Sequence, residues 1–346
     1  MLIDIIKYSS ISTKIKGMFS KLLTEEDYKN LIEKKSVNEV AEYLKNRTSY
    51  SDLLSKVNVS MIHRGQLEKV LINQMINDYQ KIFHHIRGKV KGFIKLIYDK
   101  YEIENLKVIF RILESGESIN LKEDSFTFLK DNEGIRISKL MESKNSKQLI
   151  TNLKGTVYYD VLKDYENSTT FLNLFNIETT LDQYYFFLLL KKEKKLLKAE
   201  DEIVVHETLT KQIDIMNLLW IYRSKKYFNM NREEIFNNML QNKSKLPKEV
   251  IRNLVDCKDD KQFLVLAKKT RYSDIFLENN QDSFEENYNH YMYKLNIKYM
   301  RNHSYSIGAI ISFIHLKELE IGNIISITEG IRYNIEKEDI KQFIAI

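Results

Sequence analysis

The chain has 346 residues, of which 43% are hydrophobic, and this composition predicts a globular protein with a sizeable core rather than a disordered chain. Its 54 basic and 48 acidic residues give a net charge of +6, but the two signs are interleaved, which favours solvated helix faces over a nucleic-acid-binding surface. Cys257 is the single cysteine, so an intramolecular disulfide is excluded, and the longest apolar run, residues 184–190, is far shorter than the roughly 20 residues of a membrane span.

The scarcity of helix breakers predicts an all-helical fold. Pro247 is the only proline and glycine occurs ten times, whereas folds built from strands and turns use both residues often. The abundant Lys, Glu and Leu residues are good helix formers.

The first predicted helices carry recognisable N-terminal signals. Thr24 precedes three acidic residues, and Ser36 has Glu39 at the spacing of a capping box. Residues 48–50 are then expected to form a loop, with Asp52 as the N-cap of the next helix.

A long helix is predicted next. Its apolar residues are spaced by threes and fours, at positions 67, 71, 75, 79, 82, 86, 90, 93, 97 and 101. Unbroken, this helix would extend about 50 Å at 1.5 Å per residue. Gly88 and Gly92 are positions where it can bend, and Gly116 is expected to end the helical segment.

The same spacing continues in the rest of the chain. A connection with a turn at residues 132–134 leads to a second long helix, which is predicted from Leu174 through a charged patch toward Ile213. Pro247 suits the first turn of a helix. A third long segment from about Ser283 is interrupted near residues 304–308, where Ser306 is expected to cap a last apolar helix over residues 307–319.

Two short phrases each occur three times, in strict alternation. The first fits acid-Ile-x-Asn-(Leu/Ile)-x-x-Ile, and its polar residues are Glu102 and Asn105, Asp214 and Asn217, and Glu320 and Asn323. The second has Thr, Tyr and Asp at alternate positions, in the copies Thr48, Tyr50 and Asp52; Thr156, Tyr158 and Asp160; and Thr270, Tyr272 and Asp274. This periodicity predicts three similar helical units, residues 1–117, 118–231 and 232–346.

A structural role is favoured for the repeated residues. Three equivalent sites suit a recurring packing feature better than one active site, and a buried Asn is usually satisfied by a nearby turn. Direct contact of Asn105, Asn217 and Asn323 with a partner is the alternative interpretation.

Motifs for catalysis or cofactor binding are missing from the sequence. The seven histidines form no zinc-binding spacing, and the adjacent His84 and His85 point to different sides of a helix. There is neither a phosphate-binding loop nor a dinucleotide-binding glycine motif. We therefore expect no catalytic residue, no metal and no cofactor.

Several segments together carry a resemblance to a known family. They are residues 8–14 (YSSISTK), 22–25 (LLTE), 46–52 (NRTSYSD), 101–111 (YEIENLKVIFR), 306–314 (SIGAIISFI) and 317–321 (KELEI). In these segments, and in its triplication, the sequence resembles the C subunits of the A/V-type (V-type) ATP synthases and ATPases, which are relatives of the d subunit of the vacuolar proton pump. The resemblance covers essentially the whole chain.

The resemblance implies a funnel of three helical domains around a pseudo-threefold axis, on the cytoplasmic face of the membrane. A chain of this family is a non-catalytic central-stalk subunit, which joins the shaft of the catalytic head to the membrane proteolipid ring and transmits torque for proton or sodium transport. The implied partners are therefore the shaft subunits and the ring. Two other classes stay open, a free-standing cytoplasmic helical scaffold and a nucleic-acid binder, which would show salt-sensitive duplex binding.

Overall fold

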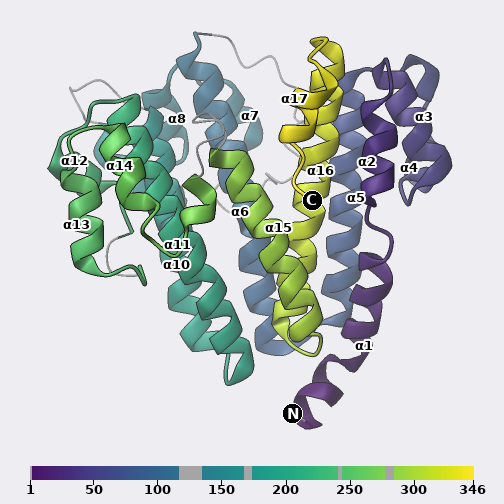
Figure 1. Cartoon of the computed structure of the whole chain (residues 1–346), viewed down its shortest axis with the longest axis horizontal. Helices are drawn as coiled ribbons and strands as arrows, with labels where there is room; N and C mark the ends of the chain where they lie inside the picture. Colours follow the sequence, from purple (N-terminus) through teal and green to yellow (C-terminus); the bar gives the residue numbers. More distant parts are fainter. Residues whose placement is uncertain (1, 117–134, 167–173, 241–243, 277–283) are drawn as a thin grey trace. The chain divides into compact units, whose positions relative to one another are not determined.

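The computed structural model describes residues 2–116, 135–166, 174–240, 244–276 and 284–346 (Figure 1). Throughout these residues every regular element is a helix and no strand occurs, which confirms the predicted all-helical class. The chain divides into two compact units. The first comprises Met1–Lys91, Ala199–Val205 and Leu264–Ile346, and the second comprises Gly92–Lys198 and His206–Phe263.

The helices that lie wholly in the first unit come from both ends of the chain. They are α1 (Leu2–Phe19), α2 (Glu25–Ile32), α3 (Val37–Arg47), α4 (Ser51–Leu54), η1 (Val59–Met61), α5 (Arg64–His85), η4 (Ser273–Phe276), α15 (Phe284–Asn302), α16 (Ile307–Arg332) and α17 (Lys337–Gln342).

The remaining helices lie wholly or partly in the second unit. They are α6 (Gly88–Glu114), α7 (Ile137–Met141), α8 (Ser146–Asn152), α9 (Val157–Glu166), α10 (Leu174–Leu196), α11 (Glu200–Lys226), α12 (Arg232–Asn237), α13 (Lys248–Asp256) and α14 (Asp260–Ala267). The chain passes from one unit to the other within α6, α11 and α14.

Helix α16 is the central helix of the first unit. It contacts α15, α5 and α1, and it also contacts α2, α3 and α17, of which α2 and α17 lie toward its C-terminal end (Figure 1). Its first ten residues are almost all apolar and mostly buried, so this helix lacks the solvated face of an ordinary amphipathic helix. A Cβ atom at Gly330 would lie 2.6 Å from the Ile340 side chain, so glycine permits the close approach of α17.

The second unit has its own core. Phe93 and Phe110 on α6, Leu189 on α10 and Ile221 on α11 are all buried. The short helix α9 packs on α8 and α10, and the ring of Tyr222 on α11 packs at a tilt against Phe263, with ring centroids 5.7 Å apart. Each unit therefore buries apolar side chains from long and short helices.

The predicted helix caps are confirmed. The Thr24 side chain accepts a hydrogen bond from the Asp27 backbone N–H while Asp27 accepts one from Thr24, which completes a capping box. Ser36 caps α3 through the Glu39 N–H, although the Glu39 carboxylate accepts from the Lys35 N–H and not from Ser36. Ser306 caps α16 by accepting from the Gly308 N–H at 3.0 Å.

Both of the first two long helices are broken where the sequence predicted continuity. The single continuous helix predicted over residues 67–101 is wrong, because α5 ends at His85 and α6 begins at Gly88, whose φ is +62°. The interruption does fall at Gly88, one of the two glycines where a bend was expected. The second predicted helix is also wrong, since α10 ends at Leu196, α11 begins at Glu200 and Ala199 has a φ of +52°. A left-handed residue cannot continue a right-handed helix, so apolar spacing alone does not show these breaks.

Some of the other predicted helix boundaries are confirmed and some are wrong. Gly116 follows the end of α6 with a φ of +75°, as a C-terminal stop should. Asp52 lies inside α4 and is not its N-cap, a position that Tyr50 takes without a side-chain bond. Pro247 immediately precedes α13, and α16 runs thirteen residues beyond Leu319 to Arg332. The turn predicted at 132–134 and the segment start at Ser283 lie outside the described residues.

Candidate functional site

The repeated residues lie on corresponding elements. The first phrase falls within the long helices, with Glu102 and Asn105 on α6, Asp214 and Asn217 on α11, and Glu320 and Asn323 on α16. The second falls at the start of a short helix, α4, α9 or η4.

The repeated Thr closes the same turn in all three copies. Its hydroxyl donates to a carbonyl three or four residues earlier, from Thr48 to Leu44 (2.6 Å), from Thr156 to Leu153 (2.7 Å) and from Thr270 to Ala267 (2.7 Å). The same oxygen accepts a backbone N–H that follows it. The turn places the Tyr of each copy in the core, whereas the Asp of each copy is exposed.

Within each unit, the buried Tyr of one repeat binds the acid of another. Tyr50 donates its hydroxyl to Glu320 Oε1 at 2.7 Å, and Tyr158 donates to Glu102 Oε2 at 2.9 Å. The Tyr of the first repeat therefore meets the acid of the third, and the Tyr of the second meets the acid of the first. The third acid, Asp214, accepts from the Ser244 hydroxyl and the Lys245 N–H.

The repeated Asn holds a later backbone segment in two of its three copies. Asn323 accepts from the Ala345 N–H and donates to the Ala345 carbonyl, both at 3.0 Å. Asn217 makes the same pair of contacts with Leu240, at 2.9 and 3.4 Å. Asn105 Nδ2 is buried and has no hydrogen-bond partner within the described residues. The amide thus ties the end of a short segment to a long helix.

Charged side chains of both signs lie around the Tyr50–Glu320 pair. Lys317 Nζ donates to Glu320 Oε1 at 2.6 Å and to the Tyr50 hydroxyl at 2.9 Å, and lies 3.9 Å from Asp78 Oδ2. The other Asp78 oxygen accepts from Lys81 at 3.0 Å and from the Gln74 amide at 3.1 Å. Burial and the neighbouring Glu320 carboxylate raise the pKa of Tyr50, so its hydroxyl stays protonated and can donate.

The Tyr158–Glu102 pair in the second unit has a different neighbour. Asp99 lies one helical turn before Glu102, at the position that Lys317 occupies before Glu320. Burial, with a smaller contribution from the Glu102 charge, raises the pKa of Asp99 to about 6. Two acids therefore share the space beside Tyr158, whereas an acid and a lysine share it beside Tyr50.

Sequence analysis missed Lys317, Asp78 and Asp99. The signal for Lys317 and Asp99 was present, because a residue three positions before the repeated acid lies on the same helix face. Asp78 had no such signal, since it comes from α5 and its place beside Lys317 depends on tertiary packing.

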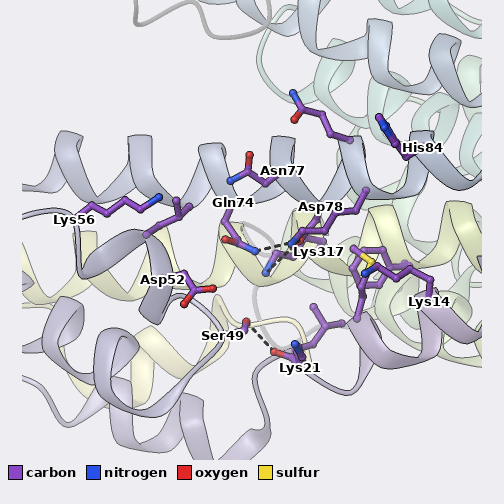
Figure 2. A pocket seen from close by; sticks show the side chains of 16 residues that line it. Lys14, Lys21, Ser49, Asp52, Lys56, Gln74, Asn77, Asp78, His84 and Lys317 are labelled. Atoms are coloured by element: carbon purple, nitrogen blue, oxygen red, sulfur yellow. Dashed lines mark hydrogen bonds and ion pairs between the residues drawn. The ribbon is translucent and has the colours of Figure 1, made fainter.

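A cavity of about 580 Å³ borders these charged side chains (Figure 2). Gln74, Asp78 and Lys317 contribute to its lining, together with Lys14 and Lys56 from other segments. The described residues contain no group of three or more His, Cys, Asp and Glu side chains placed to hold a metal ion. In the same part of the chain no helix has the length and apolar character required to cross a bilayer.

These features define an all-helical protein in which repeated Thr, Tyr, Asn and acidic side chains bond to one another or to the backbone. Comparison with known proteins gives the family. Residues 11–343 match the family model described as ATP synthase (C/AC39) subunit, and the chain belongs to this family. It is therefore a subunit of an ATP synthase complex.

Named relatives agree over nearly the full length. The C subunit of the A-type ATP synthase of Methanocaldococcus jannaschii is 24% identical over 356 residues, covering 99% of this chain and 88% of that protein. The protein of the same name from Methanobrevibacter smithii is 26% identical over 338 residues, covering 93% and 84%, and that from Methanosphaera stadtmanae is 24% identical over 362 residues, covering 99% and 89%.

Proposed function

We propose that this chain is the non-catalytic central-stalk subunit that joins the rotating shaft of the catalytic head to the membrane proteolipid ring. The observation that carries the proposal is the family match over residues 11–343, together with relatives named as the C subunit of an A-type ATP synthase. In this role the chain sits on the cytoplasmic face of the membrane as a peripheral subunit and transmits torque for proton or sodium transport.

The length and packing of the helices support a role in torque transmission. Helices α6 and α11 have 27 residues each and α16 has 26, which corresponds to about 40 Å at 1.5 Å per residue. Close-packed interiors have low compressibility and transmit strain. The Asn323–Ala345 and Asn217–Leu240 bonds add polar links between long helices and the segments beside them.

The repeated residues support a structural role rather than catalysis. Their hydroxyl, carboxylate and amide groups are directed at one another and at the backbone. In the proposed complex the nucleotide sites therefore lie on other subunits, and this chain hydrolyses no ATP. The division into three repeat units around a pseudo-threefold axis belongs to the same proposal and would give the shaft a socket.

Reconstitution tests this function. Head, shaft and ring sector should be combined with and without this chain, and ion pumping should be measured per ATP hydrolysed. We expect hydrolysis in both preparations but coupled pumping only with the chain present. Raising salt should weaken docking, because the Debye length falls from about 10 Å at 0.1 M to about 3 Å at 1 M. Equal coupling in both preparations would contradict the proposal.

A further inference from the structure

The lysine-lined cavity lies entirely within the first unit. Five chain segments form its wall: α1, the turn after α1, the region of α4, α5 and α16. Its volume of about 580 Å³ falls in the range of small-molecule sites, about 300–1,000 Å³. Figure 2 shows side chains from these separate segments around one space.

The charge of this cavity is unbalanced. Five lysines line it, at positions 14, 21, 56, 81 and 317, against two aspartates, Asp52 and Asp78. Asp78 already accepts from Lys81 and lies near Lys317, which is itself bonded to Glu320. Within the described residues no ion pair is found for Lys14, Lys21 or Lys56. The rim therefore presents three uncompensated cations.

The other lining groups favour a polar ligand. Ser49 and the amides of Gln74, Asn77 and Gln80 supply hydrogen-bonding groups, and Phe313 is the only Phe, Tyr or Trp in the lining. Phe313 and His84 are the two aromatic rings of the lining, which offers little for stacking a base. Lysine is a compact point charge and a common partner of phosphate oxygens, and all the basic side chains of Lys or Arg type in the lining are lysines.

We propose that this cavity binds a small, multiply phosphorylated anion, held by Lys14, Lys21 and Lys56. The ligand enters a concave site of small-molecule size, which distinguishes it from an acidic polypeptide lying across a flat surface. Of the two aspartates in the lining, only Asp52 has no ion pair within the described residues. Its negative charge repels the phosphate groups of such a ligand. This site does not rest on the coupling role, because binding is a property of the isolated chain.

Calorimetric titration of the full chain with tripolyphosphate, at one low salt concentration, tests the proposal. The triple variant K14Q/K21Q/K56Q should bind about tenfold or more weakly, since three attractive charges are lost. The matched control, K194Q/K195Q/K198Q, removes the same charge from exposed positions in the second unit and should bind as wild type does.

Asp52→Asn provides a test in the opposite direction. Because it removes the opposing charge, it should tighten tripolyphosphate binding by about twofold to fivefold. Asp160→Asn, the corresponding exposed Asp of the second repeat, should leave binding unchanged. Equal affinity of the pocket triple variant and wild type, or no binding by wild type, would overturn the proposal. So would tighter binding of a poly-glutamate peptide than of tripolyphosphate, which would assign the surface to an acidic polypeptide.

Discussion

The Tyr50–Glu320 pair of the first unit and the Tyr158–Glu102 pair of the second make the same hydrogen bond in different electrostatic surroundings. One turn before the acid, the first unit has Lys317, with its side chain 4% exposed, and the second has Asp99. A lysine neutralises the buried carboxylate, whereas a second carboxylate repels it. The Tyr–carboxylate bond is thus common to these two pairs, whereas the charge of the neighbouring side chain differs between them.

Because Lys317 and Asp99 carry opposite charges, their removal should change the free energy of unfolding in opposite directions. In the first unit the buried charges depend on one another, so removal of one member leaves the others unpaired. In the second unit the Asp99 carboxylate opposes folding when it is ionised, so its removal should help. The following predictions test this contrast, from the largest expected effect to the smallest.

Lys317→Met should destabilise the protein by about 3–5 kcal/mol, because it leaves Glu320 buried without its cation. Urea denaturation followed by circular dichroism measures the change. The matched control is Lys211→Met at the corresponding position of the second repeat, where the side chain is 22% exposed and pairs with Glu207. We expect a loss there of at most about 1 kcal/mol. Equal losses at the two positions would refute the contrast.

Asn323→Leu and Asn217→Leu should cost similar amounts, about 1–3 kcal/mol each. Either change leaves a backbone N–H and carbonyl, of Ala345 or Leu240, without their side-chain partner. This prediction concerns what the two units share, so the expected result is equality. Asn302→Ala, at an exposed position, serves as the control and should change stability by less than about 0.5 kcal/mol. Normal unfolding combined with lost partner binding would place these amides at an interface instead.

Tyr50→Phe should be more costly than Tyr158→Phe. The Tyr50 hydroxyl both donates to Glu320 and accepts from Lys317 in the core, so its loss should cost about 1–3 kcal/mol. Glu102 is only partly buried and water can replace the Tyr158 hydroxyl, so we expect about 1 kcal/mol there. Denaturant unfolding of both single variants at neutral pH makes the comparison, and the reverse order would count against it.

Asp99→Asn should stabilise the protein by about 1 kcal/mol near pH 8, after allowance for solvent screening. The pKa of Asp99 is raised from an ordinary value of 3.8 to about 6 in the folded state. As pH rises from about 4 to 6, the unfolded chain releases this proton first, so wild-type stability falls over that window and stays lower above it.

At pH 4 folded wild type holds the proton and the unfolded chain has released only about half of it, so most of the advantage of Asp99→Asn should disappear. Unfolding free energies of variant and wild type, measured between pH 4 and pH 8, give the difference directly. A constant difference across this range would show that the titration of Asp99 is not its cause.

Local features of the fold were predictable because their causes are local. The Thr24, Ser36 and Ser306 caps each bond a backbone N–H two or three residues away, and the stop at Gly116 depends on that residue's own φ. Ala199 shows the limit, since its φ of +52° lies in the break between α10 and α11, at a residue type that favours helices.

The sequence alone determined the helical class, through its rare prolines and glycines, and it showed which residues recur. It also indicated the family, which the full-length match confirmed. For the recurring residues the sequence predicts a structural role, since three equivalent positions do not suit one active site.

Only the tertiary structure decided which residues meet. Tyr50 and Glu320 are separated by 270 positions, and the cavity above them draws its wall from five segments. Helical periodicity specifies which face of a helix is buried, but not which distant segment covers that face. The charge beside each buried acid, and the cluster of lysines at the rim, therefore follow from packing and not from any local pattern.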